Sequence, residues 1–321
     1  MTVPHQNKTL YKITNDAHKG LFISWCFLLG VFSIAGNSLV LVASIKYQAL
    51  RLDKISVILI KNISFADVCY AVAVILVVGW SVIENNWPFN HLLCEMNVYL
   101  QYWVALVDIN MIWVLNVTKI ICIMYPMQSR TRSKSTGYIL AATMWVLSSI
   151  YPTQCAAMRR PVDFDYRSYR CAYLHTLDEW EWLDPLNIIV FLLVPNIIVI
   201  VTAVWLLVYA NKIAGIHKQA VVTMLTVSFV FCVSYAPIGV YFVAEKWIIE
   251  AAGEDRHEDL LYTKLYRYGM LLKFLNNSVN PVIYYATITS FREFVKERVF
   301  RIRKGDVRVE NTAGKTKSTE C

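Results

Sequence analysis

The chain has 321 residues, of which 57% are hydrophobic and 17% are charged, and its formal net charge is +8. Soluble domains carry about a quarter charged residues, so this composition excludes an ordinary water-soluble protein. The positive charge forms no basic stripe interleaved with aromatic residues, which argues against nucleic acid as a partner.

Hydrophobic residues gather in seven segments of about 20 residues or more, the length at which a helix crosses ~30 Å of hydrocarbon. Lipid admits only helices and closed barrels, and continuous segments of this length predict helices. We therefore expect an all-α membrane protein, a seven-transmembrane helix bundle over residues 21–286, whose first span is a retained signal anchor. The predicted spans are residues 21–45, 57–83, 92–124, 138–157, 186–209, 220–247 and 260–286.

Charge in the connecting turns predicts the orientation of these spans. The turns on one side are basic, and Asp53 is the only acid among them, whereas the longer loops on the other side are acidic. The positive-inside rule places the basic side in the cytoplasm and residues 1–20 outside the cell, as in a multi-pass plasma-membrane protein. The outer segment contains the sequon Asn7-Lys8-Thr9, which predicts glycosylation at Asn7. The basic turn residues are Lys46, Arg51, Lys54, Arg130, Arg132, Lys134, Lys212 and Lys218.

Residues 287–321 are the predicted cytoplasmic tail. Phe291, Phe294, Val295 and Arg298 recur at helical spacing in its first part. This pattern predicts an amphipathic helix at about 289–303 that lies on the membrane lipid of the inner leaflet.

Polar residues and prolines occupy characteristic places within the spans, in the order Gly36-Asn37, Asp67, Trp145, Pro195, Phe231, Pro237 and Asn280-Pro281-x-x-Tyr284. This set resembles the landmarks of class A (rhodopsin-like) G-protein-coupled receptors, and the chain is identified as a divergent member of that family. The resemblance implies a receptor, not an enzyme, with an extracellular ligand, a heterotrimeric G protein and arrestin as partners. It also implies a disulfide between Cys94 and Cys171 on the outer, oxidising side.

The same resemblance assigns an ion site within the bundle. It comprises Asp67, Asp108, Asn276, Asn277 and Asn280, with Na⁺ as an allosteric ion and no other cofactor or metal. Two carboxylates in a low-dielectric site cannot both stay charged without a cation or a shared proton. We hypothesise that Lys273 forms an ion pair with Asp108 or Asp67. The alternative is a protonated Asp108 with Lys273 extending into the outer cavity.

The residues assigned to the activation switch are Thr118, Lys119, Ile109, Pro195, Phe231, Pro237, Pro281 and Tyr284. Prolines within helices introduce kinks at which the helices can pivot. The family's acid-arginine-aromatic triplet is replaced by Thr118-Lys119-Ile120. Lysine keeps the charge but loses the planar guanidinium, and Thr118 removes the neighbouring acid. We therefore expect the family's local lock to be absent.

The predicted ligand pocket comprises Gln101, Tyr102, Tyr235, Tyr241, Lys273 and Phe274. Gln101 stands where amine receptors of the family carry an aspartate, which disfavours a monoamine and leaves a peptide or another small molecule. The lysine that holds retinal in opsins corresponds to Phe274, and Lys273 is rotated from it by ~100°, which disfavours photoreception.

Three functions remain open from the sequence. The first is a receptor that signals through G proteins, and the second is a decoy or constitutively biased receptor in which coupling is weak or absent. The third is an ion or proton carrier that uses Asp67, Asp108 and Lys273, against which the absence of internal repeats argues.

Overall fold

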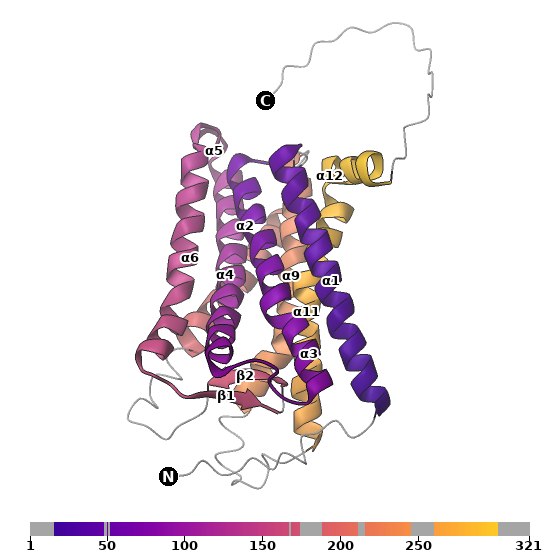
Figure 1. Ribbon diagram of the computed structural model, residues 1–321. Helices are drawn as coiled ribbons and strands as arrows, with labels where there is room; N and C mark the ends of the chain where they lie inside the picture. Colours follow the sequence, from indigo (N-terminus) through magenta and orange to yellow (C-terminus); the bar gives the residue numbers. More distant parts are fainter. Residues whose placement is uncertain are drawn as a thin grey trace, which may run out of the picture.

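The computed structural model describes residues 16–47, 50, 52–166, 168–173, 188–210, 216–244 and 260–300. Asn7, the acidic loop residues 178–184 and 250–259, and the tail beyond residue 300 lie outside this part. In it, seven long helical units stand side by side as a bundle (Figure 1), which confirms the predicted fold class. They are α1 (Asp16–Lys46), α2 (Lys54–Tyr70) continued by η1 (Ala71–Ile75) and α3 (Leu76–Glu84), α4 (His91–Met124), α6 (Lys134–Ala157), η2 (Ile188–Leu193) continued by α8 (Val194–Ala210), α9 (Ile216–Ala244) and α11 (Leu260–Thr287).

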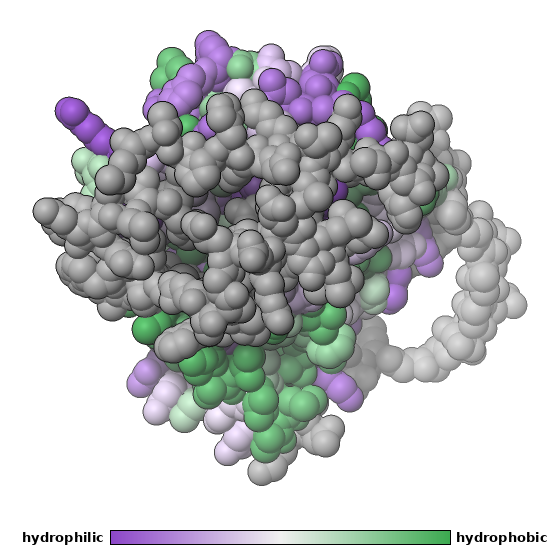
Figure 2. All heavy atoms as spheres, turned by 90° about the horizontal axis from the view of Figure 1, so that it is seen from below, coloured by the Kyte–Doolittle hydropathy of each residue, from purple (hydrophilic) through white to green (hydrophobic). Residues whose placement is uncertain are grey.

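Four helical stretches among the described residues are long and apolar enough to cross a membrane: Lys19–Lys46, Lys54–Glu84, His91–Met124 and Val221–Val240. The apolar stretch in α8 is shorter, and α6 and α11 carry more polar residues. Many large hydrophobic side chains point out of the bundle, such as Leu28, Val204 and Phe229, which is 68% exposed. Figure 2 shows hydrophobic residues gathered on one side of the molecule. Such surfaces suit contact with lipid.

Short elements distinguish the two ends of the bundle (Figure 1). One end, called the hairpin end below, is the end at which α1 starts and carries the antiparallel strands β1 (Val162–Asp165) and β2 (Arg170–Tyr173). The other, the α12 end, carries α5 (Pro126–Thr131), α12 (Thr289–Phe294) and the π-helical turn η5 (Val295–Val299). The helix predicted over residues 289–303 is present as far as Val299.

The sequence analysis did not predict the β-hairpin. Its first strand alternates buried and exposed residues, with Val162 and Phe164 turned inward. Phe164 pairs with Cys171, and in the second strand both Arg170 and Cys171 are buried.

Pro281 determines how α11 packs against α1. Proline has no N–H group, so the carbonyl of Asn277, four residues earlier, loses its usual helical donor. The side chains of Ser33 and Asn37 on α1 supply the missing donors, each 3.0 Å from the Asn277 carbonyl oxygen. The sequence motif in α11 therefore creates a hydrogen-bonding site that α1 fills.

Gly36 allows this close approach. A Cβ atom added at Gly36 would lie 2.8 Å from Cγ and 3.0 Å from Cβ of Pro281. The proline ring is rigid, so the two helices would have to separate to accommodate a methyl group.

We predict that Gly36→Ala destabilises the protein by about 1–3 kcal/mol, because it overpacks the contact between α1 and α11. Thermal unfolding of the detergent-solubilised protein measures the effect. Gly239→Ala is the matched control, since a Cβ at Gly239 meets no atom within 4 Å and alanine favours the helix. Equal stability of Gly36→Ala and wild type would contradict the packing described here.

Candidate functional site

Two buried carboxylates meet in the middle of the bundle. Asp67 on α2 and Asp108 on α4 are both at most 1% exposed. The amide nitrogen of Asn277 lies 2.9 Å from Asp67 Oδ1 and 3.5 Å from Asp108 Oδ2, and Asn280 donates to Asp67 Oδ2 at 2.9 Å. The structure therefore brings four of the five predicted ion-site residues into one hydrogen-bonded cluster.

The same cluster contains buried oxygens that have no partner within the described residues. These oxygens are Asp108 Oδ1 and Asn277 Oδ1. Asn276, the predicted ion-site residue outside the cluster, also has a buried amide nitrogen without a partner among the described residues. Carboxylate and amide oxygens are the ligands that hard cations prefer. The residues present thus fit a small cation such as Na⁺, with Asp67, Asp108 and Asn277 as the oxygen donors.

Lys273 does not form the ion pair with Asp108 or Asp67 that we expected. Among the described residues, the contacts of its ammonium group are with aromatic rings: it lies 5.2 Å from the ring centre of Tyr70 and 5.6 Å from that of Tyr235. Cation–π contacts of this kind hold a desolvated lysine without a carboxylate. The amide of Asn277, and not the ammonium group of Lys273, donates to both carboxylates.

Aromatic rings surround Lys273 and continue toward the α12 end. Tyr235 stacks on Phe231 at 4.4 Å, and Tyr70 lies 6.3 Å from Phe274. All four rings are buried. Tyr235 therefore contributes both to the lysine site and to the core below it.

At the hairpin end, the strand β2 inserts Arg170 into the predicted ligand pocket. Arg170 donates to Gln101 Oε1 at 2.5 Å and to the hydroxyl of Tyr266 at 2.6 Å. Gln101 in turn donates to the carbonyl of Cys171 at 3.3 Å and to Asn97. The sequence analysis missed Arg170, although its place beside a disulfide cysteine was a signal that it lies near the bundle.

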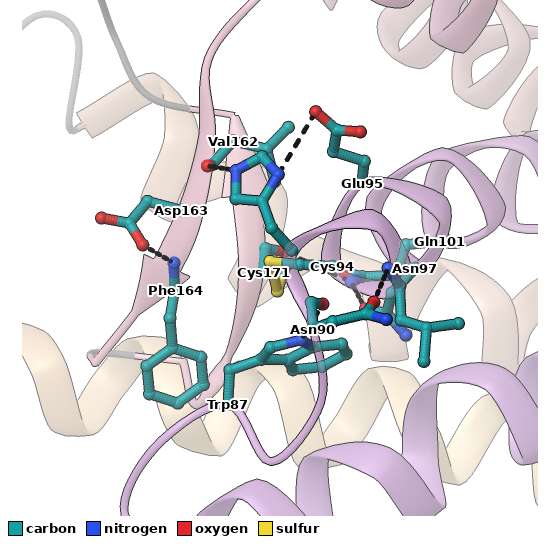
Figure 3. The surroundings of a disulfide bond; sticks show 12 residues. Trp87, Asn90, Cys94, Glu95, Asn97, Gln101, Val162, Asp163, Phe164 and Cys171 are labelled. Atoms are coloured by element: carbon teal, nitrogen blue, oxygen red, sulfur yellow. Dashed lines mark hydrogen bonds and ion pairs between the residues drawn. A yellow bond between two sulfur atoms is a disulfide. The ribbon is translucent and has the colours of Figure 1, made fainter.

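The implied disulfide between Cys94 and Cys171 is present in the structure, with Cα atoms 5.5 Å apart (Figure 3). It joins β2 to the start of α4 and so positions Arg170 over the helices. Tyr102 stacks on Tyr173 at 5.6 Å in the same region. The side chain of Tyr241, the remaining predicted pocket residue, lies outside the described residues.

A different ionic contact is found at the α12 end. The ammonium group of Lys119 on α4 pairs with Asp53, and the lysine side chain is only 2% exposed. Asp53 is also the N-cap of α2, where it accepts from the backbone N–H of Ser56 at 3.0 Å and from its hydroxyl at 2.8 Å. Thr118 turns away and donates to the carbonyl of Leu115 in its own helix.

Burial raises the pKa of Asp53, but the charge of Lys119 and the hydrogen bonds from Lys119 and Ser56 outweigh it and hold the pKa below its ordinary value. A lowered folded-state pKa means that the contact stabilises the fold above the unfolded pKa of about 4. That stabilisation is lost only as the pH falls through the lower, folded-state value. The carboxyl group of Asp53 is therefore charged at neutral pH.

The local contact of the family's helix 3 triplet is absent, as expected, because Thr118 bonds within its own helix. The sequence analysis did not predict that Lys119 would instead pair with Asp53, the N-cap of α2. The sequence analysis noted Asp53 only as an acid in a basic turn, and its 66-residue separation from Lys119 gave no sign of the contact.

The remaining switch residues lie in the core between the two ends. Ile109, Phe231 and Tyr284 are nearly or fully buried, and the Tyr284 hydroxyl has no partner within the described residues. Asn116, which we had not assigned to a site, donates to Thr202 at 3.2 Å and to Ser228 at 2.9 Å. These bonds join α4, α8 and α9. Pro195 follows the π-helical η2, while Pro237 and Pro281 lie within α9 and α11.

Comparison with known protein families agrees with this arrangement. Residues 36–284 match the family described as 7 transmembrane receptor (rhodopsin family). The match covers most of the chain and runs from Gly36 to Tyr284, the first and last of the sequence landmarks. The chain belongs to this family, which is one of membrane receptors and not of enzymes.

We predict that Asn277→Leu is more destabilising than Asn276→Leu. The first change removes a donor from two buried carboxylates, at a cost of about 1–3 kcal/mol, while the second removes an unpaired nitrogen. Thermal unfolding in sodium-free buffer measures both. The reverse order of stability would contradict the described hydrogen bonding.

Proposed function

We propose that this protein is a cell-surface receptor that binds an extracellular ligand at the hairpin end and signals through heterotrimeric G proteins at the α12 end. The basic residues of the turns support an orientation with the α12 end in the cytoplasm. The observation that carries the proposal is the pairing of the buried Lys119 with the partly exposed Asp53, because it gives the cytoplasmic face a contact that can be made or broken.

Lys119 occupies the family position of the arginine that docks the G protein. In the resting arrangement its charge is neutralised by Asp53, and a docked G protein needs that charge to be free. Ligand binding therefore shifts an equilibrium between a paired and a released Lys119. The flexible lysine stem suits such a change, since it can re-aim the ammonium group without a change of helix position.

Contacts along the bundle support a link between the two ends. The stack of Tyr235 on Phe231 lies directly below Lys273, and Pro237 provides a pivot in the same helix. Asn116 connects this helix to α4, which carries Lys119. Movement of α9 thus changes the surroundings of α4.

The helix formed by α12 and η5 is proposed to rest on membrane lipid and to help form the docking face for the G protein and arrestin. Phe291 and Val295 pack inward, whereas Lys296, Val299 and Phe300 are exposed. Exposed hydrophobic and basic side chains on one short helix suit an anionic leaflet surface.

Na⁺ is proposed as an allosteric ion at Asp67 and Asp108. We predict that replacing N-methylglucamine by Na⁺ in the buffer raises the thermal unfolding temperature of the wild type. Asp108→Asn should reduce this increase, because it removes one of the two charges that bind the cation. A sodium-dependent increase of the same size in Asp108→Asn would contradict the assignment.

The signalling proposal predicts that Asp53→Asn raises ligand-independent second-messenger output. Loss of a contact worth ~1 kcal/mol shifts the equilibrium roughly fivefold toward the released state. Lys54→Gln is the matched control, since Lys54 is exposed and adjacent to Asp53. Lys119→Ala breaks the same contact but also removes the positive charge proposed to dock the G protein, so its second-messenger output should be lost. Lys119→Arg keeps that charge and should keep the output.

A second function, a receptor of the same fold with weak or absent coupling, is motivated by Thr118 in place of the family's acid. The same assay separates the two. If wild type, Asp53→Asn and Lys119→Arg all give no output while reaching the cell surface, the uncoupled receptor is favoured and the signalling proposal fails.

A further inference from the structure

Arg170 is a buried positive charge with only neutral partners among the described residues. Arg170 is only 6% exposed. Its two terminal nitrogens, Nη1 and Nη2, donate hydrogen bonds to Gln101 and to the hydroxyl of Tyr266. Its third nitrogen, Nε, is buried and has no partner within the described residues. A guanidinium group stays charged under all ordinary conditions, and a buried charge that lacks a counter-charge is costly.

The surroundings of Arg170 contain a second cation and a second unpaired donor. Lys273 lies on α11 two helical turns after Tyr266, the hydrogen-bond partner of Arg170, and so on the same side of that helix. Its ammonium group is 5.2 Å from the ring centre of Tyr70. The hydroxyl of Tyr70 is buried and, within the described part of the chain, has no hydrogen-bond partner. Arg170 Nε, Tyr70 and Lys273 therefore present three donors to one region.

No carboxylate of the described residues lies within ion-pair distance of Arg170 or Lys273. Asp108 makes no ion pair with Lys273, and its Oδ2 atom accepts a hydrogen bond from Asn277 at 3.5 Å. Arg267 differs from these two cations, because it donates to the Tyr166 carbonyl at 3.1 Å and covers the ring of Tyr169, so it holds the hairpin in place.

We propose that the ligand of this receptor is an acid with an aromatic body, whose oxyanion binds Arg170, Lys273 and Tyr70. Carboxylate and phosphate oxygens match the planar donors of arginine and form charge-assisted hydrogen bonds with them. Tyr102, Tyr235 and Phe274 supply aromatic faces in the same half of the bundle. This inference deepens the proposed function and rests on it, since it names the chemical class that the receptor recognises.

Matched probe pairs that differ only in charge test the proposal. Thermal unfolding of the full-length, detergent-solubilised receptor is measured with phenylacetate against phenylacetamide, indole-3-acetate against indole-3-acetamide, and phenyl phosphate against phenol. The acids should raise the unfolding temperature in a concentration-dependent way, and the neutral partners should not.

Arg170→Gln should abolish the increase given by the acids. Arg159→Gln, which changes an exposed arginine just before the hairpin, is the matched control and should keep it. Lys273→Met is a second test that leaves the hydrogen bonds of Arg170 to Gln101 and Tyr266 intact, and it should weaken the response to the acids.

The proposal is overturned if acids and neutral partners act alike, if no acid in the series has an effect, or if Arg170→Gln responds as the wild type does. In that case Arg170 only ties the hairpin to α4 and α11. The ligand-independent output of Asp53→Asn does not depend on Arg170, so its persistence would show that the signalling proposal stands while the ligand class is wrong.

Discussion

The structure depends on one constraint: polar groups buried within the membrane must find their partners inside the protein. Asn277 shows how this constraint builds the bundle. Its carbonyl, freed by Pro281, accepts hydrogen bonds from Ser33 and Asn37, while its side-chain amide donates to Asp67 and Asp108. A single residue thereby joins α11 to α1, α2 and α4. Such bonds are specific in direction, so they fix how the helices face one another where hydrophobic contact alone would not.

The same constraint applies to a buried cation at each end of the bundle. Lys119 is buried against Asp53 at the α12 end, and Arg170 is buried against Gln101 and Tyr266 at the hairpin end. A paired buried charge is stable only while its partner remains in place. Any rearrangement that removes the partner must supply another one, and the proposed function uses this requirement to make each end responsive to a bound molecule of suitable charge.

Much of this arrangement could be predicted from the sequence. The length of the hydrophobic segments predicted the helices, and the resemblance to the receptor family implied the clustering of Asp67, Asn277 and Asn280. The contact between Lys119 and Asp53 could not be predicted, because it joins residues 66 positions apart and depends on where the first turn of α2 begins. The hairpin was missed because its strands have only four residues each. For Lys273, the sequence could not show whether its ammonium group contacts a carboxylate or an aromatic ring. The packing of the helices places it against the rings of Tyr70 and Tyr235.

The central claim is that Lys119 and Asp53 stabilise the resting bundle through their direct contact. A double-mutant cycle on thermal unfolding, with Asp53→Asn, Lys119→Met and the double variant, tests it most directly. The account predicts that the effects of the two changes on stability are not additive. Each single change destabilises the protein, and the double variant is at least as stable as the less stable of the two single variants. Additive effects of the two changes would mean that the residues act independently, and would contradict the account.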